Sequence, residues 1–479
     1  MSDHNLKFYI NGAWIEPTAP HTHEVINPAT EEKIATIALG NAADVDKAVV
    51  AARAAFRSYS RTSPRERIAL LEAIIAAYKK RIDDIAEAVT AEMGAPAGFA
   101  HSFHAASQSG VFQQFIDILK TYEFEKLQGT TAIVREPIGV CGLITPWNVP
   151  VGAIVGKLAP ALAAGCTVIV KPSEIAPLSP LILADVMHDA GVPKGVFNLV
   201  NGDGAGVGQA IAAHDGIDMV SFTGSTRAGI AVAKAAAESV KRVQQELGGK
   251  SANIILPDAD LEKVVTAGLN RCYVGGGQSC QAPTRMLVPR EAQDRALAAA
   301  KAAAEAFVVG DPNDPKTTMG PVSNKAQWDK IQRLIKAGIE EGAKLVAGGA
   351  GRPQGLNRGC YVKPTVFGDV DPHSSVAQEE IFGPVLSIIP YKDEAQAIEI
   401  ANDTMYGLAG WVYSSTLAHA KEVALQMRTG RVYLNGAGPD PYAPFGGYKR
   451  SGNGREGGIF GLEEYLEVKA LLGAAPAAS

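Results

Sequence analysis

The best candidate nucleophile in this sequence is Cys280, within the segment Gly275-Gly276-Gly277-Gln278-Ser279-Cys280-Gln281. Consecutive glycines allow the backbone to approach a ligand closely, and a peptide N–H beside the sulfur could stabilise an oxyanion. The total of 5 cysteines is odd and includes no Cys-x-x-Cys pair, which argues against a disulfide framework and against a zinc site. The other cysteines have apolar neighbours, so we expect them to be small buried hydrophobic residues: Cys141, Cys166, Cys272 and Cys360.

Two further segments carry side chains that could assist a nucleophile. Glu246 stands in Glu246-Leu247-Gly248-Gly249-Lys250, and we expect it to end a helical stretch before the strand Ser251 to Leu256, where one α/β domain passes to the next. A cleft is expected at such a crossing, although a lone glutamate at a helix end is usually a solvated charge. Asn148 lies in Pro146-Trp147-Asn148-Val149-Pro150, a rigid turn that preorganises its amide as a donor; the simpler interpretation is an ordinary Asx turn.

Two more polar motifs fall at the ends of predicted strands. Lys171-Pro172-Ser173-Glu174 closes the strand Thr167 to Val170. Phe222-Thr223-Gly224-Ser225-Thr226 closes the strand Met219 to Phe222, with Ser225 placed to cap the next helix. Carboxyl ends of parallel strands bind ligands in α/β sheets, and a helix N-terminus accepts phosphate, so both motifs are candidate ligand sites.

The elements that must position these residues follow an α/β pattern. From about residue 137, short β-branched runs alternate with Ala-rich helical stretches, and a second such region begins near residue 251 and continues past 400. The segment Ser63-Pro64-Arg65-Glu66 is a capping box that predicts a helix, with apolar residues at helical spacing until Gly94. The apolar stretch Val151 to Val170 contains Lys157 and Pro160, which favours a buried helix followed by a strand over a membrane span.

Composition narrows the functional classes. At roughly 150 residues per domain, 479 residues suggest about three domains, or two large ones with an appendage. The formal charge of −5 makes nucleic acid and anionic membranes poor candidate partners. The segment Met1 to Ile10 lacks the apolar core of a signal peptide, so we expect a cytoplasmic protein. The sequence contains no Walker loop, His-Glu-x-x-His or Gly-x-Ser-x-Gly motif, and its Gly452-x-Gly454-x-x-Gly457 does not follow a predicted strand.

Taken in this order, the motifs resemble the aldehyde dehydrogenase superfamily along nearly the whole chain. Two further landmarks are Glu380-Ile381-Phe382-Gly383-Pro384 and Pro444-Phe445-Gly446-Gly447. The resemblance implies an NAD-binding α/β domain (1–120 and 138–247), a catalytic α/β domain (248–448), and an oligomerisation arm with the C-terminal segment (121–137 and 449–479). The β arm is expected around Tyr122 to Glu136 with a strand near Leu466 to Leu472. Because such an arm is a bare sheet edge in a monomer, we expect a homodimer or homotetramer.

The resemblance also implies a mechanism. Cys280 would attack the aldehyde, with the oxyanion held by the Asn148 amide and the Cys280 N–H, and a thioester would form after hydride transfer to the nicotinamide. Glu246 would act as general base on the water that hydrolyses the thioester, which favours release of the acid over transfer to coenzyme A. Lys157 and Glu456 could face each other in a proton path from Glu246, the alternative being a structural ion pair. Three rival interpretations of the chain are a non-catalytic member, a coenzyme A-acylating enzyme and a purely esterolytic enzyme.

The family pattern places NAD against residues of the first α/β region. Lys171 and Glu174 would contact the adenosine ribose, and Ser225 would contact the pyrophosphate. Because the carboxylate of Glu174 accepts hydrogen bonds from both ribose hydroxyls and repels a 2′-phosphate, NAD is preferred over NADP. No metal is implied. The predicted cofactor set also contains Glu380 and Phe382 at the nicotinamide end, and Thr145, Trp147, Ser173, Gly204, Gly208, Phe222, Gly224 and Leu247.

The sequence says less about the substrate. Positions where relatives use bulky aromatic or arginine side chains hold Val149, Gly152, Ala153 and Gly156, which predicts a wide mouth. Nothing there resembles the arginine expected for a carboxylate-bearing semialdehyde or the aromatic box for a quaternary ammonium. We therefore predict a neutral aldehyde, bulky or aromatic. The candidate walls are Tyr442 and Phe445, together with Ser279 and Gln281 beside the nucleophile; the role of Gln281 is not assigned.

Overall fold

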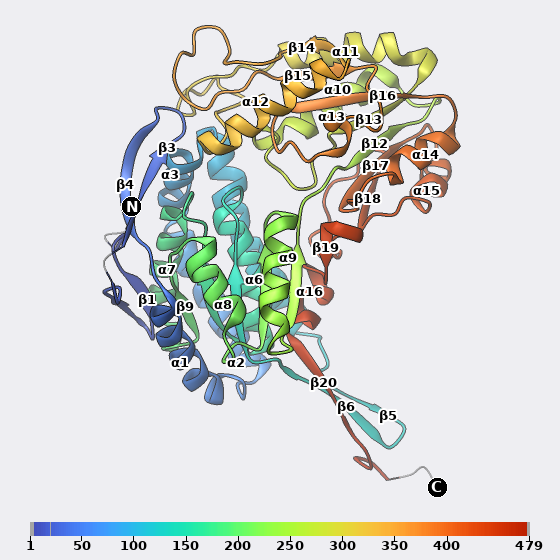
Figure 1. Cartoon of the computed structure of the whole chain (residues 1–479). Coiled ribbons are helices and arrows are strands. Elements are labelled where there is room, and N and C mark those ends of the chain that lie inside the picture. The colour runs from blue at the N-terminus through green and yellow to red at the C-terminus, as the bar shows by residue number, and fades with distance from the viewer. Residues whose placement is uncertain (1–3, 20, 477–479) are drawn as a thin grey trace.

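The computed structural model describes residues 4–19 and 21–476. In Figure 1, two helix-covered sheets lie one above the other, and a thin β arm projects from the lower one. Across the described residues, the lower sheet has the strand order β19-β11-β10-β7-β8-β9-β1-β2. Its strands are β1 (Phe8–Ile10), β2 (Ala13–Ile15), β7 (Val140–Ile144), β8 (Thr167–Lys171), β9 (Phe197–Leu199), β10 (Met219–Thr223), β11 (Arg242–Glu246) and β19 (Gly452–Asn453).

The five central strands of the lower sheet are parallel. β7, β8 and β9 are buried along their whole length, as expected for a parallel sheet with helices on both faces. After β9 the chain crosses to the other side of β7 and adds β10 and β11, so the strand order reverses between β7 and β10. Ligands bind at such a reversal in open α/β sheets, at the carboxyl ends of the strands.

Helices of the N-terminal half cover the lower sheet. Ser63 caps the predicted helix with a capping box, but the helix does not continue to Gly94 as the apolar spacing suggested. It ends at Lys79, and a new helix starts at Ile82, where acidic residues in the first turn favour a new N-terminus. Gly94, with φ of 73°, ends this second helix. The helices of this layer are α1 (Ala42–Tyr59), α2 (Pro64–Lys79), α3 (Ile82–Met93), α4 (Ala97–Phe99), α5 (Ser109–Leu119), α6 (Pro150–Ala164), α7 (Leu178–Asp189), α8 (Gln209–Ala213), α9 (Thr226–Ala237) and α16 (Gly458–Glu464), with π-helical turns at Ala100–Ala105 and Gly204–Gly208 and a 3₁₀ turn at Ala106–Gln108.

The upper sheet repeats this arrangement with its own hydrophobic core. Its strands are β12 (Ala252–Ile255), β13 (Arg285–Pro289), β14 (Lys344–Ala347), β15 (Thr365–Gly368), β16 (Val385–Tyr391), β17 (Ala409–Tyr413) and β18 (Arg431–Leu434). Over the described residues their order is β14-β15-β16-β13-β12-β17-β18, so this order reverses between β12 and β17. Its helices are α10 (Leu261–Tyr273), α11 (Gln293–Glu305), α12 (Lys325–Glu340), α13 (Ser375–Gln378), α14 (Glu394–Asn402) and α15 (Leu417–Ala424), with 3₁₀ turns at Val274–Gly277, Arg290–Ala292 and Lys449–Ser451.

The arm is a separate small sheet. β5 (Glu125–Gln128), β6 (Thr131–Pro137) and β20 (Leu466–Leu471) pair antiparallel, as the expected β arm requires. A hairpin of β3 (Thr22–Asn27) and β4 (Glu32–Ala38) lies beside α3. The predicted fold class, two parallel α/β layers with a β arm, is confirmed. Within residues 4–19 and 21–476, no helix combines the length and apolar character needed to cross a bilayer.

Candidate active site

Glu246 lies at the end of a strand, where the residue pattern predicted the end of a helix. It is the last residue of β11 and pairs in register with Thr223 of β10. The preceding helix stops at Ala237, and Val240, with φ of 55°, turns the chain toward the sheet. The helical interpretation was therefore wrong, because pairing with two neighbouring strands outweighs the intrinsic helix preference of Gln and Glu.

Cys280 follows a glycine turn that only glycines accommodate without strain. Gly275, Gly276 and Gly277 have φ of 60°, 69° and 72°. A Cβ on Gly277 would lie 2.2 Å from the carbonyl oxygen of Gly383, so the turn packs closely against the Glu380–Phe382 segment. Cys280 is partly exposed, whereas the remaining cysteines are all buried, as their apolar neighbours predicted.

The segment Glu246 to Lys250 passes between Cys280 and Glu380. A Cβ on Gly249 would lie 2.3 Å from the carbonyl oxygen of Cys280, and one on Gly248 would lie 2.7 Å from a carboxylate oxygen of Glu380. The N–H of Gly249 donates to Glu380 Oε1 at 2.9 Å. These glycines therefore bring three predicted site residues together, because any side chain at either position would push the segments apart.

Asn148 is tied to the same turn. Its Nδ2 donates to the carbonyl oxygen of Gln278 at 2.9 Å, two residues before Cys280. The side chain of Gln278 accepts from the N–H of Ser323 at 2.8 Å and donates to the carbonyl oxygen of Gly275 at 3.1 Å. Gln278 thus fixes the turn at both ends, a role that sequence reasoning missed because its partners are distant in the chain.

The carboxylate of Glu246 has no partner inside the described part of the protein. Only 2% of the residue is exposed, and neither of its oxygens accepts a hydrogen bond. Burial, and secondly the negative charge of Glu456, raise the pKa of Glu246 well above its ordinary value. Burial and the charge of Glu246 also raise the pKa of the Cys280 thiol. Burial thus disfavours the charged form of both groups.

Lys157 and Glu456 face each other as the resemblance implied. Lys157 of α6 forms an ion pair with Glu456 Oε1, and its side chain is fully buried. A Cβ on Gly156 would lie 3.8 Å from the other oxygen of Glu456, so α6 packs closely beside this pair. Gly446, in the second glycine landmark, lies against Glu246: a Cβ there would lie 2.9 Å from Glu246 Oε1. The pair and the buried glutamate thus belong to one charged cluster.

The predicted cofactor residues gather at the carboxyl edge of the lower sheet. Lys171 Nζ donates to the carbonyl oxygens of Pro172 and Gly202 and lies 3.5 Å from Glu174 Oε2. Ser225 caps α9 by accepting from the N–H of Ala228. A Cβ on Gly204 would meet nothing within 4 Å, and one on Gly208 would lie 3.7 Å from the Lys171 side chain. The other predicted cofactor residues lie at or shortly after the last residues of four strands. They are Thr145 and Trp147 after β7, Ser173 after β8, Phe222 and Gly224 at the end of β10, and Leu247 after β11.

The nicotinamide end predicted from the resemblance lies across from this edge. Phe382 has φ of 60°, an unusual conformation for a phenylalanine, and its ring meets Trp147 edge-on at 5.5 Å. Gln327 of α12 holds this segment by donating to the carbonyl oxygens of Ile381 and Phe382 at 2.8 and 2.9 Å. Nothing local in the sequence marks Gln327, since its partners lie more than fifty residues further along the chain.

A pocket of about 350 Å³ opens beside Cys280. Asn148, Val149, Ser279 and Gln281 line it, so the structure brings these predicted residues together. Gln281, left without a role by the sequence, accepts a hydrogen bond from the Tyr433 hydroxyl at 3.0 Å. Sequence reasoning missed an aromatic wall, although its spacing on one helical segment was a usable signal: Phe99, Phe103 and His104.

Other predicted substrate walls lie elsewhere. The wide mouth predicted from the small α6 residues is absent at Gly152, because a Cβ there would meet Val149 at 2.7 Å and Gln108 at 2.9 Å. Gln108, from a neighbouring helical turn, fills the space that the glycine leaves. Tyr442 donates to Asp117 Oδ2 at 3.2 Å on the surface, and Phe445 lies under the Arg431 guanidinium. Gly152, Ala153, Gly156, Tyr442 and Phe445 do not line the pocket beside Cys280.

This chain belongs to the aldehyde dehydrogenase family, whose profile matches residues 14–471. A 3-succinoylsemialdehyde-pyridine dehydrogenase from a Pseudomonas species is 54% identical over 468 residues, which cover 98% of each chain. The resemblance inferred from the motifs is thereby confirmed.

Solved structures agree across the whole fold. Aldehyde dehydrogenase C from Pseudomonas syringae, a cysteine-to-alanine mutant in complex with NAD⁺ and octanal, matches with a TM-score of 0.99 and 53% identity, covering 100% of this chain and 99% of that one. An aldehyde dehydrogenase from Mycobacterium tuberculosis, complexed with NAD⁺, matches with a TM-score of 0.95 and 41% identity over 99% of both chains.

Proposed function

We propose that this protein oxidises an aldehyde to a carboxylic acid with NAD as hydride acceptor. The observation that carries the proposal is the meeting of Cys280, Asn148 and Glu246 between the two sheets. Cys280 is the partly exposed cysteine of the described chain, and its neighbours Ser279 and Gln281 line a pocket large enough for a small organic substrate. The P. syringae relative was crystallised with NAD⁺ and octanal, which is consistent with this function.

In this proposal Cys280 is the nucleophile. Its thiol must lose a proton before attack. We assign Glu246 as the base that takes this proton, because it is buried nearby and its charge acts on the thiol. The developing oxyanion would be stabilised by the Asn148 amide and the Cys280 N–H, each contributing about 3 to 4 kcal/mol in comparable sites. Asn148 has two N–H bonds and gives one to Gln278, which leaves the other for the substrate oxygen.

Thioester hydrolysis would then use Glu246 as general base. Its unpartnered oxygens can accept a proton from a water molecule without first breaking a hydrogen bond to the protein. The ion pair of Lys157 and Glu456 would carry that proton toward solvent, and the alternative is that this pair is only structural. A pH profile of kcat that is unchanged in Glu456→Gln would favour the structural alternative.

The residues at the carboxyl edge of the lower sheet fit a dinucleotide. Thr145 Oγ1 is buried without a partner among residues 4–19 and 21–476, and the space beside Gly204 is open, as expected where a ligand completes the contacts. NAD, when bound, supplies the acceptor for the aldehyde hydride. Glu174 would favour NAD over NADP, because a 2′-phosphate would be repelled. An equal or larger kcat/KM with NADP would contradict this part of the proposal.

For the substrate we propose a neutral aldehyde with a bulky or aromatic body. The pocket wall supports this choice, since Phe99 and Phe103 stack at 4.9 Å and His104 meets both rings edge-on.

We further propose a homo-oligomer, either dimer or tetramer, because apolar residues of the arm such as Leu127 and Val468 are exposed.

The test is an aldehyde panel with NAD, read as NADH absorbance. Octanal and benzaldehyde should be oxidised with higher kcat/KM than succinate semialdehyde, and the acid should be the product with or without coenzyme A. Acyl-coenzyme A as the product would favour the acylating alternative. Absence of NADH with every aldehyde would favour a non-catalytic member, and an unreactive Cys280 toward iodoacetamide would support that outcome.

A further inference from the structure

The pocket beside Cys280 contains a single formally charged side chain. Among the described residues that line it, Arg271 is the only lysine, arginine, aspartate or glutamate. His104 also lines the pocket, but burial lowers its pKa to about 4, so its ring is neutral at the pH of an enzyme assay. The pocket therefore presents one positive charge in surroundings that are otherwise neutral.

Arg271 has no acceptor among the described residues of the protein. It stands in the last turn of α10, half-buried, and its side chain takes part in no hydrogen bond or ion pair within residues 4–19 and 21–476. Its guanidinium instead lies over the ring of Tyr433, with Cζ 5.9 Å from the ring centre. Stacking of this kind leaves the N–H bonds in the guanidinium plane free to donate to a ligand.

The ring beneath Arg271 is rigidly held. Tyr433 is 4% exposed and stacks on Trp411 at 4.9 Å, with an angle of 11° between the rings. Its hydroxyl donates to Gln281 Oε1 at 3.0 Å and lies 3.3 Å from Arg431. Because Gln281 directly follows Cys280, this chain of contacts fixes the position of Arg271 relative to the nucleophile.

The remaining wall is suited to the body of a substrate and not to its polar end. Phe99 and Phe103 form the stacked pair, and Phe99 lies 3.6 Å from the Cβ position of Gly275 in the turn before Cys280. His104 is 3% exposed, and its Nδ1 has no partner within the described chain, so one further polar atom of the pocket awaits a ligand. A polar group on the substrate thus has its strongest donor in Arg271.

We propose that Arg271 is a specificity-determining residue that binds a hydrogen-bond-accepting group at the end of the substrate remote from the aldehyde. This inference rests on the proposed aldehyde oxidation. It adds a distal hydrogen-bond acceptor to the apolar or aromatic body proposed above: a carbonyl, a ring nitrogen or, in place of a neutral substrate, a carboxylate. The guanidinium donates to that acceptor, while the aldehyde carbon reaches Cys280.

The experiment compares three aldehydes of matched chain length on the purified full-length enzyme with saturating NAD. They are octanal, methyl 8-oxooctanoate and 8-oxooctanoate, which end in a methyl group, a neutral acceptor and an anionic acceptor. For each protein, the readout is the kcat/KM of each acceptor-bearing aldehyde divided by that of octanal. The variants are Arg271→Met, which keeps the length of the side chain without its donors, and Arg271→Lys, which keeps the charge without the planar fork.

Arg290→Met is the matched control, because the Arg290 side chain is exposed, has no partner within the described chain and does not line the pocket. It removes the same charge and should leave the ratios of the wild type unchanged. In Arg271→Met we expect the ratio for at least one acceptor-bearing aldehyde to fall about tenfold, the loss typical of a charged hydrogen bond. A fall for the ester supports a neutral acceptor, and a fall for the carboxylate alone supports an anionic one.

Ratios that are equal in the wild type and in Arg271→Met for both acceptor-bearing aldehydes would overturn the inference and leave the proposed function standing. A wild type that forms no NADH from any of the three aldehydes would reject the proposed function itself. Thermal melting of each variant separates these outcomes from misfolding. If Arg271→Met does not fold, Arg271→Lys carries the test, since it keeps the charge above Tyr433 and should lose part of the discrimination.

Discussion

The two parallel sheets of this protein have the same pattern of strand order, but the predicted site residues lie at opposite edges of the two sheets. In the lower sheet the chain lays down β7, β8 and β9 on one side and then β10 and β11 on the other, and in the upper sheet β12, β13 and β16 are followed by β17 and β18 in the same way. Such sheets bind ligands at the carboxyl ends of their strands. The lower sheet conforms, but Cys280 and Glu380 lie before β13 and β16, at the amino edge of the upper sheet.

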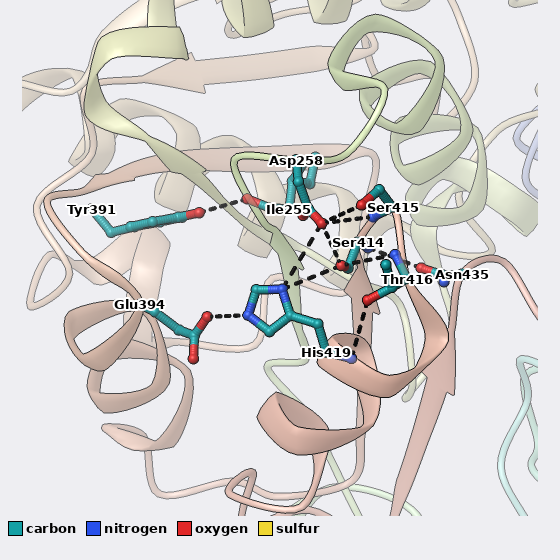
Figure 2. A network of polar contacts seen from close by, with 9 residues as sticks. All are labelled: Ile255, Asp258, Tyr391, Glu394, Ser414, Ser415, Thr416, His419 and Asn435. Atoms are coloured by element: carbon teal, nitrogen blue, oxygen red, sulfur yellow. Dashed lines mark hydrogen bonds and ion pairs between the residues drawn. The ribbon is translucent and has the colours of Figure 1, made fainter.

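The difference is visible in how polar groups are satisfied. At the carboxyl edge of the lower sheet, buried atoms of Thr145, Asn201 and Glu246 have no hydrogen-bond partner within the described chain. Figure 2 shows the carboxyl edge of the upper sheet, where polar side chains bond to one another instead. Asp258, after β12, accepts from Ser414 Oγ at 2.8 Å and from Ser415 N and Oγ at 3.1 and 2.5 Å.

Asp258 therefore stands where a ligand would bind. The reversal of strand order lies between β12 and β17, and Ser414 and Ser415 lead from β17 into the N-terminus of α15. A carboxylate of the chain itself binds the N–H and hydroxyl groups of the two residues that precede the N-cap of α15. The comparison teaches that unsatisfied buried polar atoms, rather than topology alone, distinguish an edge kept for a ligand from one closed by the fold.

The largest expected effect tests the nucleophile. Cys280→Ala should lower kcat about 10³- to 10⁴-fold, because the other cysteines are buried and none of them can replace the thiol that forms the covalent intermediate. The measurement is steady-state NADH formation, with quantification of thiols by mass spectrometry after brief alkylation. Cys360→Ala is the control and should retain activity, since Cys360 is buried in the hydrophobic core of the upper layer. Full activity of Cys280→Ala would remove the basis of the proposed mechanism.

The second prediction sharpens the contrast at the lower edge. Glu246→Gln should lower kcat about 10²- to 10³-fold as a lost general base, without loss of stability. Glu246 stabilises nothing through hydrogen bonds, since both of its oxygens lack partners in the described chain. Its raised pKa means that the folded state holds a proton that the unfolded state loses near the ordinary value of 4.5. Wild-type stability should therefore decrease relative to Glu246→Gln as pH rises from about 4.5 through the folded pKa.

That result is read from urea unfolding of both proteins across a pH series. The wild-type kcat should rise with pH through the same elevated pKa, because only the deprotonated carboxylate accepts a proton. A variant markedly less stable than the wild type at neutral pH would show that Glu246 has a structural partner, and the contrast with Asp258 would be lost.

The third prediction concerns Asp258, whose carboxylate is hydrogen-bonded where that of Glu246 is not. Asp258→Asn should lower the free energy of unfolding by about 1 to 2 kcal/mol, because it weakens charge-assisted hydrogen bonds at a site that water partly reaches. Partial burial acts to raise the pKa of Asp258, but hydrogen bonds from Ser415 and Ser414 lower it overall. The difference between wild type and variant should therefore shrink as pH falls below the ordinary value of 3.8. kcat/KM should be unchanged, and a large loss of activity would contradict the closed-edge interpretation.

The sequence predicted the strands and helix caps that depend on local pattern better than the contacts between distant segments. β8 and β10 begin at Thr167 and Met219 as predicted, and Ser63 caps α2, because all three depend on local pattern. Glu246 was placed on a helix, since nothing in its own segment reveals the two strands that pair with it. The break between α2 and α3 was missed because apolar spacing continues across it.

The site residues divide in the same way. Cys280, Asn148 and Glu246 stand in short motifs whose residue types suggest their chemistry, so the sequence alone could propose them. Gln278 and Gln327 bond to distant segments, and Arg271 lines a pocket whose other walls come from distant segments, so no local pattern marks them. The wide mouth at Gly152 failed for this reason too, since Gln108 comes from another element.

The smallest expected effect concerns His419, which joins α15 to α14 in the same closed edge (Figure 2). Its Nε2 lies 2.6 Å from Glu394 Oε2, and its Nδ1 lies 3.3 Å from Ser414 Oγ and 3.9 Å from Asp258 Oδ2. The hydrogen bond to Glu394, with the nearby charges of Asp258 and Glu422, raises the pKa of His419 above 6.5. Its stabilising effect is therefore complete below about 6.5 and is lost as pH rises through the folded pKa.

His419→Gln should cost less than about 1 kcal/mol at pH 6, because the pair is partly exposed, and almost nothing at pH 9. The measurement is the melting temperature of both proteins at the two pH values. His21→Gln is the control, since the exposed His21 side chain forms no hydrogen bond or ion pair within the described residues. An equal loss at both pH values would mean that His419 stabilises the edge by packing, and the upper edge would then be closed by Asp258 alone.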